Sequence, residues 1–427
     1  MEQLVIEKSK NLRGEIDSQG SKNSALPILA ATVIVRGKSV IHKCPHLTDV
    51  EAAIKILRYL GCKVEWQDDA LVVDSETVNR CDIPEDLMHE MRSSIVFLGP
   101  LLGRCGKAEL SAPGGCEIGL RPIDLHIKSV KRFGVEINEG FGKISCRANG
   151  KLKSCETVLS FPSVGATENA MLSACLAEGT SVIFNSAREP EIEDLADFLN
   201  KCGAKISGAG TGKIVVEGVK RLSGCEHTVI PDRIMISTYL ACCAVTGGEI
   251  KINNVCCDHI SPTFNVFVQS GCELICRQNS VTVKSNGELK PIGTVRTMPY
   301  PGFPTDFQAP SMTMACVANG TSVIVENIFE SRFKHACELI RMGANIKVEG
   351  RVSVIEGVKE LTGANVTSTD LRGGSALVVA GLCAQGQTVV RNLSHIDRGC
   401  EKFSETLNSL GARIRREQTP DEKGQKT

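Results

Sequence analysis

LRYLGCKVE (57–65) is the first of six copies of one helix ending, and these copies decide the fold. The others are VKRFGVEIN (130–138), LNKCGAKIS (199–207), VQSGCELIC (268–276), IRMGANIKV (340–348) and LNSLGARIR (407–415). The steps between their glycines, which are Gly61, Gly134, Gly203, Gly271, Gly343 and Gly411, are 73, 69, 68, 72 and 68 residues. A helix that turns directly into a strand needs a left-handed residue at its end, so we predict that each of these glycines ends a helix.

The residues before each glycine have the pattern of a surface helix. In the first copy Val50, Ala53, Ile54 and Leu57 form an i, i+3, i+4, i+7 stripe. Thr48 lies three residues before Glu51, which predicts a capping box at the start of this helix.

A second segment recurs upstream of each ending, and it reads as a helix of small residues followed by Gly and a strand. Examples are TENAMLSACLAEGTSVIF (167–184) and SALVVAGLCAQGQTVV (375–390). These helices are apolar nearly all round, so we expect them to be buried, three in the centre of each half. Together with a β-hairpin such as RVSVIEGV (351–358), they give the order strand, helix, strand, helix, strand, strand, repeated six times.

Six such βαβαββ repeats predict an α/β (α+β) protein of two globular domains with three repeats each. We expect one domain at 22–230, and a second at 1–21 plus 231–416. The opening strand, Leu4 to Glu7, is expected to pair with the C-terminal half, and 417–427 is expected to be a disordered tail.

Composition limits the classes of function. Lys plus Arg and Asp plus Glu both number 49, and aromatic residues make up 4% of the 427, which disfavours a nucleic-acid or membrane-surface protein. No apolar run is long enough to span a membrane, and the start has no signal-peptide pattern, so we expect a cytoplasmic protein. The oligomeric state cannot be predicted from these data.

Most of the 20 cysteines are expected to be small buried side chains in a reducing compartment. A disulfide framework is typical of small secreted chains, and the sequence lacks a CxxC pair for a zinc site. His259 beside Cys256 and Cys257 is only a weak metal candidate, so we predict no metal. GAGTGK (208–213) resembles a phosphate loop, but it lies between two β runs and is expected to be a hairpin turn.

One cysteine has an unusual context, in PGGCEIGLRPIDLH (113–126). Gly114 and Gly115 free the backbone before Cys116, and Pro122 stiffens it after Arg121. A thiol near a guanidinium can act as an acid or a nucleophile, although the composition alone favours an ordinary turn cysteine.

This loop resembles that of the UDP-N-acetylglucosamine 1-carboxyvinyltransferase family of enolpyruvyl transferases. The resemblance covers nearly the whole chain and includes GSKNSALP (20–27), MRSS (91–94), FPSVGATEN (161–169), PDRI (231–234), PTDFQ (304–308), ENIFESRFKHACEL (326–339), TDLRGGSAL (369–377) and HIDRGCE (395–401). It implies the inverse α/β barrel, or prism, of these transferases. It also implies transfer of the enolpyruvyl group from phosphoenolpyruvate to the 3′-hydroxyl of UDP-N-acetylglucosamine, without a cofactor, as the first committed step of peptidoglycan precursor synthesis.

The resemblance also assigns roles to residues. The implied catalytic residues are Cys116 as acid, Asp306 as base, and Lys22, Arg121 and Arg398. Phosphoenolpyruvate is expected at Lys22, Asn23, Arg121, Arg332, Arg372 and Arg398. The UDP-sugar is expected at Asn23, Arg92, Arg121, Pro122, Ile123, Asp124, Leu125, Ser163, Val164, Gly165, Asp306 and Ile328. Glu330 is expected to orient these groups. Asp306 can also be read as a helix N-cap, and Ser163 as the cap of the helix that follows it.

The chain departs from the usual family pattern at three positions, where Met235, Ser331 and Cys400 stand in place of Glu, Asn and Tyr. They leave open a low-turnover second-copy enzyme or a regulatory paralogue that binds the UDP-sugar. A transferase that acts on shikimate 3-phosphate, like 5-enolpyruvylshikimate-3-phosphate synthase, is the third alternative.

Overall fold

The computed structural model describes residues 2–111 and 123–418, and it divides them into two compact units. One unit holds residues 20–111 and 123–230, and we call it the 20–230 unit. The other holds residues 2–19 and 231–418, and we call it the 231–418 unit. Each is described by itself.

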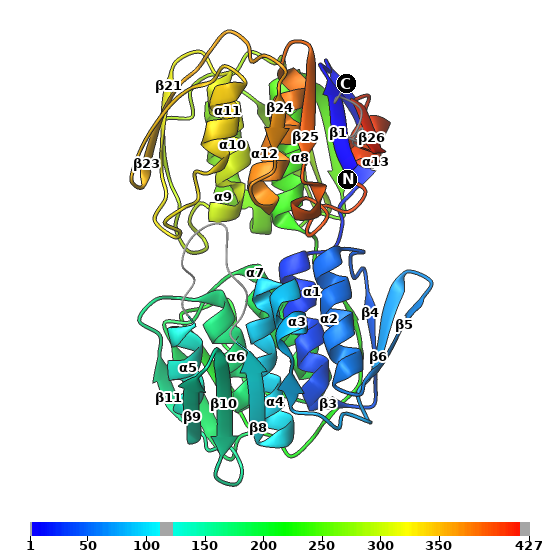
Figure 1. Cartoon of the computed structure of the whole chain (residues 1–427), viewed down its shortest axis with the longest axis vertical. Coiled ribbons are helices and arrows are strands. Elements are labelled where there is room, and N and C mark those ends of the chain that lie inside the picture. Colours follow the sequence, from blue (N-terminus) through cyan, green and yellow to red (C-terminus); the bar gives the residue numbers. More distant parts are fainter. Residues whose placement is uncertain (1, 112–122, 419–427) are drawn as a thin grey trace, which may run out of the picture. The chain divides into compact units, whose positions relative to one another are not determined.

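Each unit contains three four-stranded sheets with one shared pattern, in which an edge strand is parallel to its neighbour and the other pairs are antiparallel (Figure 1). In the 20–230 unit the strands are ordered β16-β4-β6-β5, β7-β8-β10-β9 and β11-β12-β14-β13. Their bounds are β4 (Lys38–His42), β5 (Lys63–Gln67), β6 (Ala70–Asp74), β7 (Asp82–Ile83), β8 (Lys107–Ser111), β9 (Val135–Gly140), β10 (Lys143–Ala148), β11 (Glu156–Val158), β12 (Thr180–Phe184), β13 (Lys205–Ser207), β14 (Lys213–Glu217) and β16 (Glu226–Thr228). A short parallel pair, β3 (Val35–Arg36) and β15 (Leu222–Ser223), is added to them.

The 231–418 unit repeats this pattern in the orders β18-β19-β17-β2, β20-β21-β23-β22 and β24-β25-β1-β26. The bounds are β1 (Glu2–Glu7), β2 (Leu12–Asp17), β17 (Gly248–Asn253), β18 (Glu273–Arg277), β19 (Ser280–Ser285), β20 (Thr294–Arg296), β21 (Thr321–Val325), β22 (Asn345–Glu349), β23 (Val352–Glu356), β24 (Asn365–Thr367), β25 (Gln387–Arg391) and β26 (Arg413–Gln418). The six-fold repeat predicted from the sequence is therefore confirmed.

The N-terminal strand completes the last repeat. β1 lies between β25 and β26 and is antiparallel to both, which confirms the predicted pairing of the opening strand with the C-terminal half. The strand β26 is longer than expected, because Glu417 and Gln418 pair with Gln3 and Glu2. The first two residues of the expected tail, Glu417 and Gln418, therefore belong to the last strand. Residues 419–427 lie outside the described residues.

Helices of small residues form the centre of each unit, as predicted. In the 231–418 unit they are α8 (Arg233–Thr246), α10 (Gln308–Cys316) and α12 (Leu371–Cys383), which pack against one another (Figure 1). All of their residues are buried. In the 20–230 unit they are α1 (Lys22–Ala31), α4 (Leu98–Cys105) with the 3-10 turn η2 (Arg92–Phe97), and α6 (Val164–Ala174).

The remaining helices lie outside these central ones. They are α2 (Thr48–Tyr59), α3 (Glu85–Glu90), α5 (Asp124–Lys131), α7 (Pro190–Lys201), α9 (Cys257–Gln269), α11 (His335–Arg341) and α13 (Phe403–Ser409), with short 3-10 turns η1 (Thr32–Ile34), η3 (Thr305–Phe307) and η4 (Leu393–His395).

All six predicted glycines have φ between +80° and +100°, which confirms that each takes the left-handed conformation.

The predicted capping box at Thr48 is wrong. Thr48 is the first residue of α2, the N-cap is Leu47, and no side chain caps this helix. The Glu51 carboxylate instead accepts a hydrogen bond from the indole of Trp66, at 3.4 Å, because the strand β5 passes beside the first turn.

The expected hairpin turn at GAGTGK is confirmed, since it joins the antiparallel strands β13 and β14.

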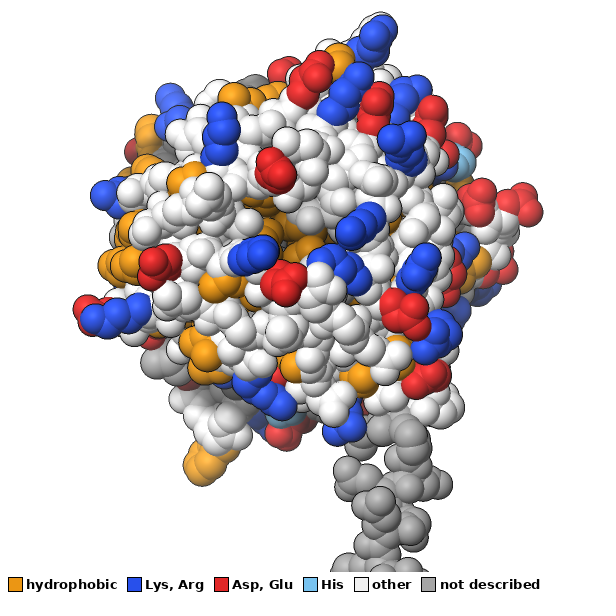
Figure 2. All heavy atoms as spheres, turned by 90° about the horizontal axis from the view of Figure 1, so that it is seen from above, with side chains coloured by type: hydrophobic (Ala, Val, Ile, Leu, Met, Phe, Trp, Pro, Cys, Tyr) orange, Lys and Arg blue, Asp and Glu red, His pale blue; other side chains and the backbone are white. Residues whose placement is uncertain are grey.

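The surface and the cysteines agree with the composition. The face shown in Figure 2 carries acidic and basic side chains interspersed, rather than one broad patch of a single sign. Nineteen cysteines are described and none forms a disulfide, and 11 of these thiols are buried. Burial raises the pKa of the Cys175 and Cys383 thiols to about 12, so they are packing residues rather than nucleophiles. No helix in the described part of the chain is long and apolar enough to cross a membrane.

Candidate functional site

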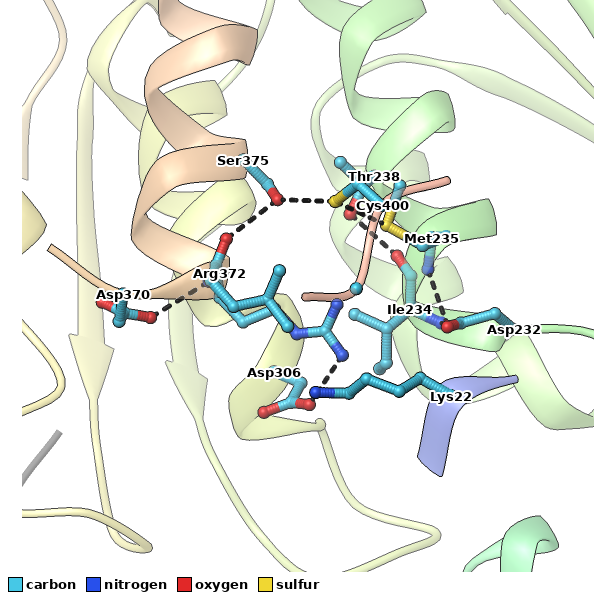
Figure 3. Close-up of polar contacts among 12 residues, drawn as sticks. Lys22, Asp232, Ile234, Met235, Thr238, Asp306, Asp370, Arg372, Ser375 and Cys400 are labelled. Atoms are coloured by element: carbon cyan, nitrogen blue, oxygen red, sulfur yellow. Dashed lines mark hydrogen bonds and ion pairs between the residues drawn. The ribbon is translucent and has the colours of Figure 1, made fainter. Parts of the chain in front are cut away.

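Two buried arginines converge on one carboxylate in the 231–418 unit. Arg332 Nη2 donates to Asp306 Oδ1 at 2.8 Å, and Arg372 Nη2 donates to Asp306 Oδ2 at 2.9 Å (Figure 3 shows the second pair). The arginine side chains are 4% and 3% exposed, whereas that of Asp306 is 27% exposed. The carboxylate is therefore the part of this group that faces solvent.

The two guanidinium groups retain hydrogen-bonding capacity. Arg332 Nε, Arg372 Nε and Arg372 Nη1 are buried and find no acceptor among the residues that the structure describes. Burial acts to lower the pKa of Arg372, but the negative charges of Asp306 and Asp232 outweigh this effect. The pKa of Arg372 is therefore raised above its ordinary value. Arg372 therefore remains cationic, and both arginines have N–H groups to spare for an anion.

The position of Arg372 follows from the start of α12. Asp370 is the N-cap, and its Oδ1 accepts from the backbone N–H groups of Arg372, at 3.0 Å, and Gly373, at 3.2 Å (Figure 3). Capping of this kind fixes the first turn of a helix, so the backbone from which the Arg372 side chain extends is rigid.

Glu326 fixes the turn that leads to Arg332, and sequence reasoning missed it. This side chain is fully buried, and its Oε1 accepts from Ile328 N at 2.8 Å, Phe329 N at 3.0 Å and Thr297 Oγ1 at 2.9 Å. Its Oε2 accepts from Thr305 Oγ1 at 2.9 Å, beside Asp306. One carboxylate thus ties the turn holding Ile328 to the turn holding Asp306. A charged residue directly after the apolar strand β21 was the available signal.

The structure bears on two roles expected from the sequence in this region, those of Asp306 and Glu330. Asp306 is not a helix N-cap, because it lies inside η3 and neither η3 nor α10 has a side-chain cap; arginines occupy both of its oxygens instead. Glu330, the expected orienting residue, is exposed and lies 3.6 Å from Arg351 Nη2. The structure therefore does not bring Glu330 to Asp306.

Arg398 lies in a loop that packs on α12. A Cβ added to Gly399 would lie 2.6 Å from Leu371 Cδ2, so the absence of a side chain at this position lets the loop lie directly on the helix. Gln19 holds the loop from the other side, donating to Gly399 O and accepting from Glu401 N, both at 3.0 Å. The loop with Arg398 is thus attached to the helix that carries Arg372.

Met235 and Cys400, two of the residues that differ from the usual family pattern, contact each other. Cys400 Sγ lies 3.3 Å from Met235 Sδ and 3.3 Å from Ser375 Oγ on α12 (Figure 3). Both residues are buried, so they fill one space between α8, α12 and the Arg398 loop. The unusual residues therefore pack as a pair rather than leaving a cavity.

In the 20–230 unit the expected residues lie at helix starts. Lys22 is the first residue of α1, and its Nζ lies 3.1 Å from Asp49 Oδ2 on α2. Asn23 follows it and is half-buried, and Arg92 begins η2.

The residues expected at the UDP-sugar are partly brought together. Ile123, Asp124 and Leu125 lie at the start of α5, and Ser163, Val164 and Gly165 lie at the start of α6, which packs against α5. The predicted Ser163 cap is confirmed, because its hydroxyl accepts from Ala166 N.

His126 joins the two helix starts and was not singled out from the sequence. Its Nδ1 lies 2.8 Å from Asn169 Nδ2, and a Cβ added to Gly165 would lie 2.7 Å from its Cε1. Free N–H groups at the start of a helix favour anions, so the first turn of α6 suits a phosphate. Near this turn, burial and the charges of Glu191 and Glu189 raise the pKa of Glu168 to about 8.

Three expected residues, Cys116, Arg121 and Pro122, lie outside the described residues. In the part of the chain that is described, no group of three or more His, Cys, Asp or Glu side chains is arranged to hold a metal ion.

The chain is similar to known proteins over nearly its whole length. A model of the family EPSP synthase (3-phosphoshikimate 1-carboxyvinyltransferase) matches residues 6–407. UDP-N-acetylglucosamine 1-carboxyvinyltransferase 2 of Caldanaerobacter subterraneus subsp. tengcongensis is 50% identical over 414 residues, which cover 97% of this chain and 99% of that relative. The protein of the same name from Carboxydothermus hydrogenoformans is 48% identical over 418 residues, with 97% and 99% covered.

Solved structures share the fold. The enolpyruvyl transferase NikO from Streptomyces tendae has a TM-score of 0.88 and 25% identity, with 98% of this chain and 99% of that chain covered. An EPSP synthase from Acinetobacter baumannii has a TM-score of 0.76 at 18% identity, with 98% and 100% covered, a likeness of fold alone. The expected fold class is therefore confirmed.

Proposed function

Because the chain belongs to the EPSP synthase family of carboxyvinyltransferases, and within it to the UDP-N-acetylglucosamine 1-carboxyvinyltransferases, we propose that it acts on UDP-N-acetylglucosamine. It transfers the enolpyruvyl group of phosphoenolpyruvate to the 3′-hydroxyl of the sugar and releases phosphate. The reaction is the first committed step of peptidoglycan precursor synthesis. The observation that carries the proposal is the 50% identity to such a transferase over nearly the whole chain.

The proposed reaction needs a base for the sugar hydroxyl, and Asp306 has the geometry for that role. Its carboxylate is the partly exposed member of the group, and Arg332 and Arg372 hold it in one orientation. As the 3′-oxygen forms a bond to carbon 2 of phosphoenolpyruvate, the hydroxyl proton passes to Asp306. Departure of phosphate with its bonding electrons, and loss of a proton from carbon 3, then give the enol ether.

The anionic groups of phosphoenolpyruvate need cations, and the unused N–H groups of Arg332 and Arg372 support a carboxylate there. In the free protein these arginines bind Asp306. An incoming carboxylate competes for them and so frees an oxygen of Asp306 to accept the proton. We assign the phosphate to Lys22, Arg121 and Arg398, and the sugar nucleotide to the helix starts at 123–125 and 163–165, with Asn23, Arg92 and Ile328.

A proton must also reach carbon 3 of phosphoenolpyruvate during addition. We assign this step to the Cys116 thiol, which can also form a covalent adduct with the three-carbon group. The pKa of Cys175, Cys383 and other buried thiols is raised by burial, which argues against their serving as the acid.

Acceptor choice tests the proposal. The purified chain is incubated with phosphoenolpyruvate and either UDP-N-acetylglucosamine or shikimate 3-phosphate, and phosphate release is followed. We expect release that requires UDP-N-acetylglucosamine. Release with shikimate 3-phosphate alone would identify a different transferase, and UDP-sugar binding without release would identify a regulatory paralogue.

A further inference from the structure

A chain of buried polar side chains connects α7 to the start of α1 in the 20–230 unit. Asp194, on α7, accepts hydrogen bonds from Ser24 Oγ, from His227 Nε2 at 2.8 Å and from the backbone N–H of Ile230 at 3.2 Å. Ser24, Asp194 and His227 are all buried. A buried carboxylate is costly unless donors satisfy it, and here three donors do so.

The hydrogen bonds also fix the tautomer of His227. Lys201 Nζ lies 3.2 Å from His227 Nδ1, and a lysine ammonium group can only donate. Nδ1 is therefore the acceptor, and the ring hydrogen is on Nε2, from which it is donated to Asp194. Lys201 thus orients the imidazole, and the imidazole orients the carboxylate.

One donor to Asp194, the hydroxyl of Ser24, lies at the start of α1, and a second, the backbone N–H of Ile230, belongs to a residue that pairs with this helix start. Ser24 is its third residue, directly after Lys22 and Asn23, and no side chain caps this helix. The N-cap residue Ser21 donates its backbone N–H to Ile230 O at 2.8 Å. Asp194 therefore holds the first turn twice, directly through Ser24 and indirectly through Ile230. The N-cap residue Ser21 makes no side-chain hydrogen bond to the helix, so these contacts with Asp194 are tertiary supports of the first turn.

We propose that Asp194, oriented by His227, is a positioning residue that sets the backbone of Lys22 and Asn23 for phosphoenolpyruvate. This role rests on the proposed function, which assigns the phosphate to Lys22. Asp194 itself does not contact substrate in this account. Loss of its hydrogen bonds releases the first turn of α1, and a displacement of about 1 Å at a binding group can reduce a rate about 100-fold.

Two substitutions of His227 separate positioning from packing. The ring packs edge-on against Phe198, with centroids 5.7 Å apart. His227→Phe keeps an aromatic ring there and removes the donor, whereas His227→Gln keeps a donor and removes the ring. Ser24→Ala removes the link to α1 with little change in volume. The matched control is Ser181→Ala in β12, which removes another buried hydroxyl, the acceptor for Cys155 N at 3.3 Å.

Two measurements are made on each full-length variant. Hydrogen exchange of a peptide spanning the first turn of α1 needs no substrate and reports whether that turn opens. Steady-state kinetics give kcat/KM for phosphoenolpyruvate. We expect His227→Phe and Ser24→Ala to speed exchange at residues 22–25 and to lower kcat/KM about 10-fold or more. His227→Gln and Ser181→Ala should stay near wild type in both.

Unchanged exchange at residues 22–25 in His227→Phe and Ser24→Ala would overturn the positioning role. So would a loss in His227→Gln with His227→Phe near wild type, because the packing of the ring against Phe198 would then be responsible. A wild-type chain without transfer activity would refute the proposed function instead, and the exchange data would still decide whether Asp194 fixes this turn.

Discussion

At the scale of residues, buried carboxylates organise the parts of both units that carry the proposed site. Glu326 joins the turns of Ile328 and Asp306, and Asp194 holds the start of α1. Each is surrounded by donors that come from distant parts of the sequence, such as Thr297 and His227. The sequence identified Asp306, Arg332 and Arg372 by resemblance. Glu326 had a local signal, as a charged residue directly after an apolar strand, but its hydrogen-bond partners and the role of Asp194 could not be predicted, because they depend on contacts formed only in the folded chain.

Substituting Glu326 by Gln tests its role. The side-chain amide places a donor where the native carboxylate receives four hydrogen bonds, so at least one of them is lost. We expect a loss of about 1–3 kcal/mol in the free energy of unfolding and a fall in kcat/KM of about 10-fold or more. The control Glu330→Gln changes an exposed residue of the same segment and should have little effect on either. Equal behaviour of the two variants would contradict this account.

Glu168 makes the stability of the chain depend on pH. Burial and the charges of Glu191 and Glu189 raise its pKa from 4.5 to about 8, so between these values the folded state holds a proton that the unfolded state releases. Its contribution to stability is thus present below pH 4.5 and lost as the pH rises through about 8. Glu168→Gln stays neutral, and it should gain stability relative to wild type as the pH rises from 5 to 8, by up to about 1.4 kcal/mol per pH unit.

Denaturant unfolding at several pH values measures this difference. Glu156→Gln, on the exposed side of β11, serves as the control for the loss of one carboxylate. A difference between Glu168→Gln and wild type that does not change with pH would show that Glu168 is ionised in the folded chain.

At the scale of elements, local sequence predicted helix ends better than helix starts. All six glycines that end helices were recognised, because a left-handed φ has a strong local signal. The predicted cap at Thr48 failed, because Glu51 instead accepts from Trp66 on the neighbouring strand β5. Similarly, Asp306 resembled an N-cap, but two arginines from later segments occupy its carboxylate. A helix start can thus be altered by tertiary partners that no local pattern contains.

The loop that carries Arg398 depends on its approach to α12. Gly399→Ala places a Cβ 2.6 Å from Leu371 Cδ2, so either the buried Leu371 side chain or the loop must shift. We expect the KM for phosphoenolpyruvate to rise several-fold, with a smaller change in melting temperature. The matched control is Gly140→Ala, where an added Cβ meets nothing within 4 Å. Kinetics in which both variants match wild type would show that the position of this loop does not matter for binding.

At the scale of the whole molecule, one repeat of four strands and two helices occurs six times, three times in each unit. The chain's first strand, β1, completes the sixth sheet, and β2 pairs with β17 in the fourth. This closure was foreseen for β1, since the period of about 70 residues left a strand over at the start. The extension of β26 to Gln418 was not, because Glu417 and Gln418 begin a polar stretch that resembles a solvated tail.

The many cysteines make a selective prediction for the whole chain. Since 11 of the 19 described thiols are buried, and burial raises the pKa of several of them, an epoxide analogue of phosphoenolpyruvate should alkylate Cys116 in the native protein and spare the buried ones. Peptide mass mapping after labelling checks this. Alkylation spread over several cysteines, or none at Cys116, would remove the support for Cys116 as the acid.

The central claim is transfer of a carboxyvinyl group to the 3′-oxygen of UDP-N-acetylglucosamine, with Asp306 as the base. Mass spectrometry and NMR of the sugar nucleotide, after incubation with phosphoenolpyruvate, test it most directly. The account predicts a 3′-carboxyvinyl product with the wild type, and a rate at least about 100-fold lower with Asp306→Asn, which still binds the UDP-sugar. An unmodified sugar nucleotide with the wild type, or a wild-type rate with Asp306→Asn, would contradict it.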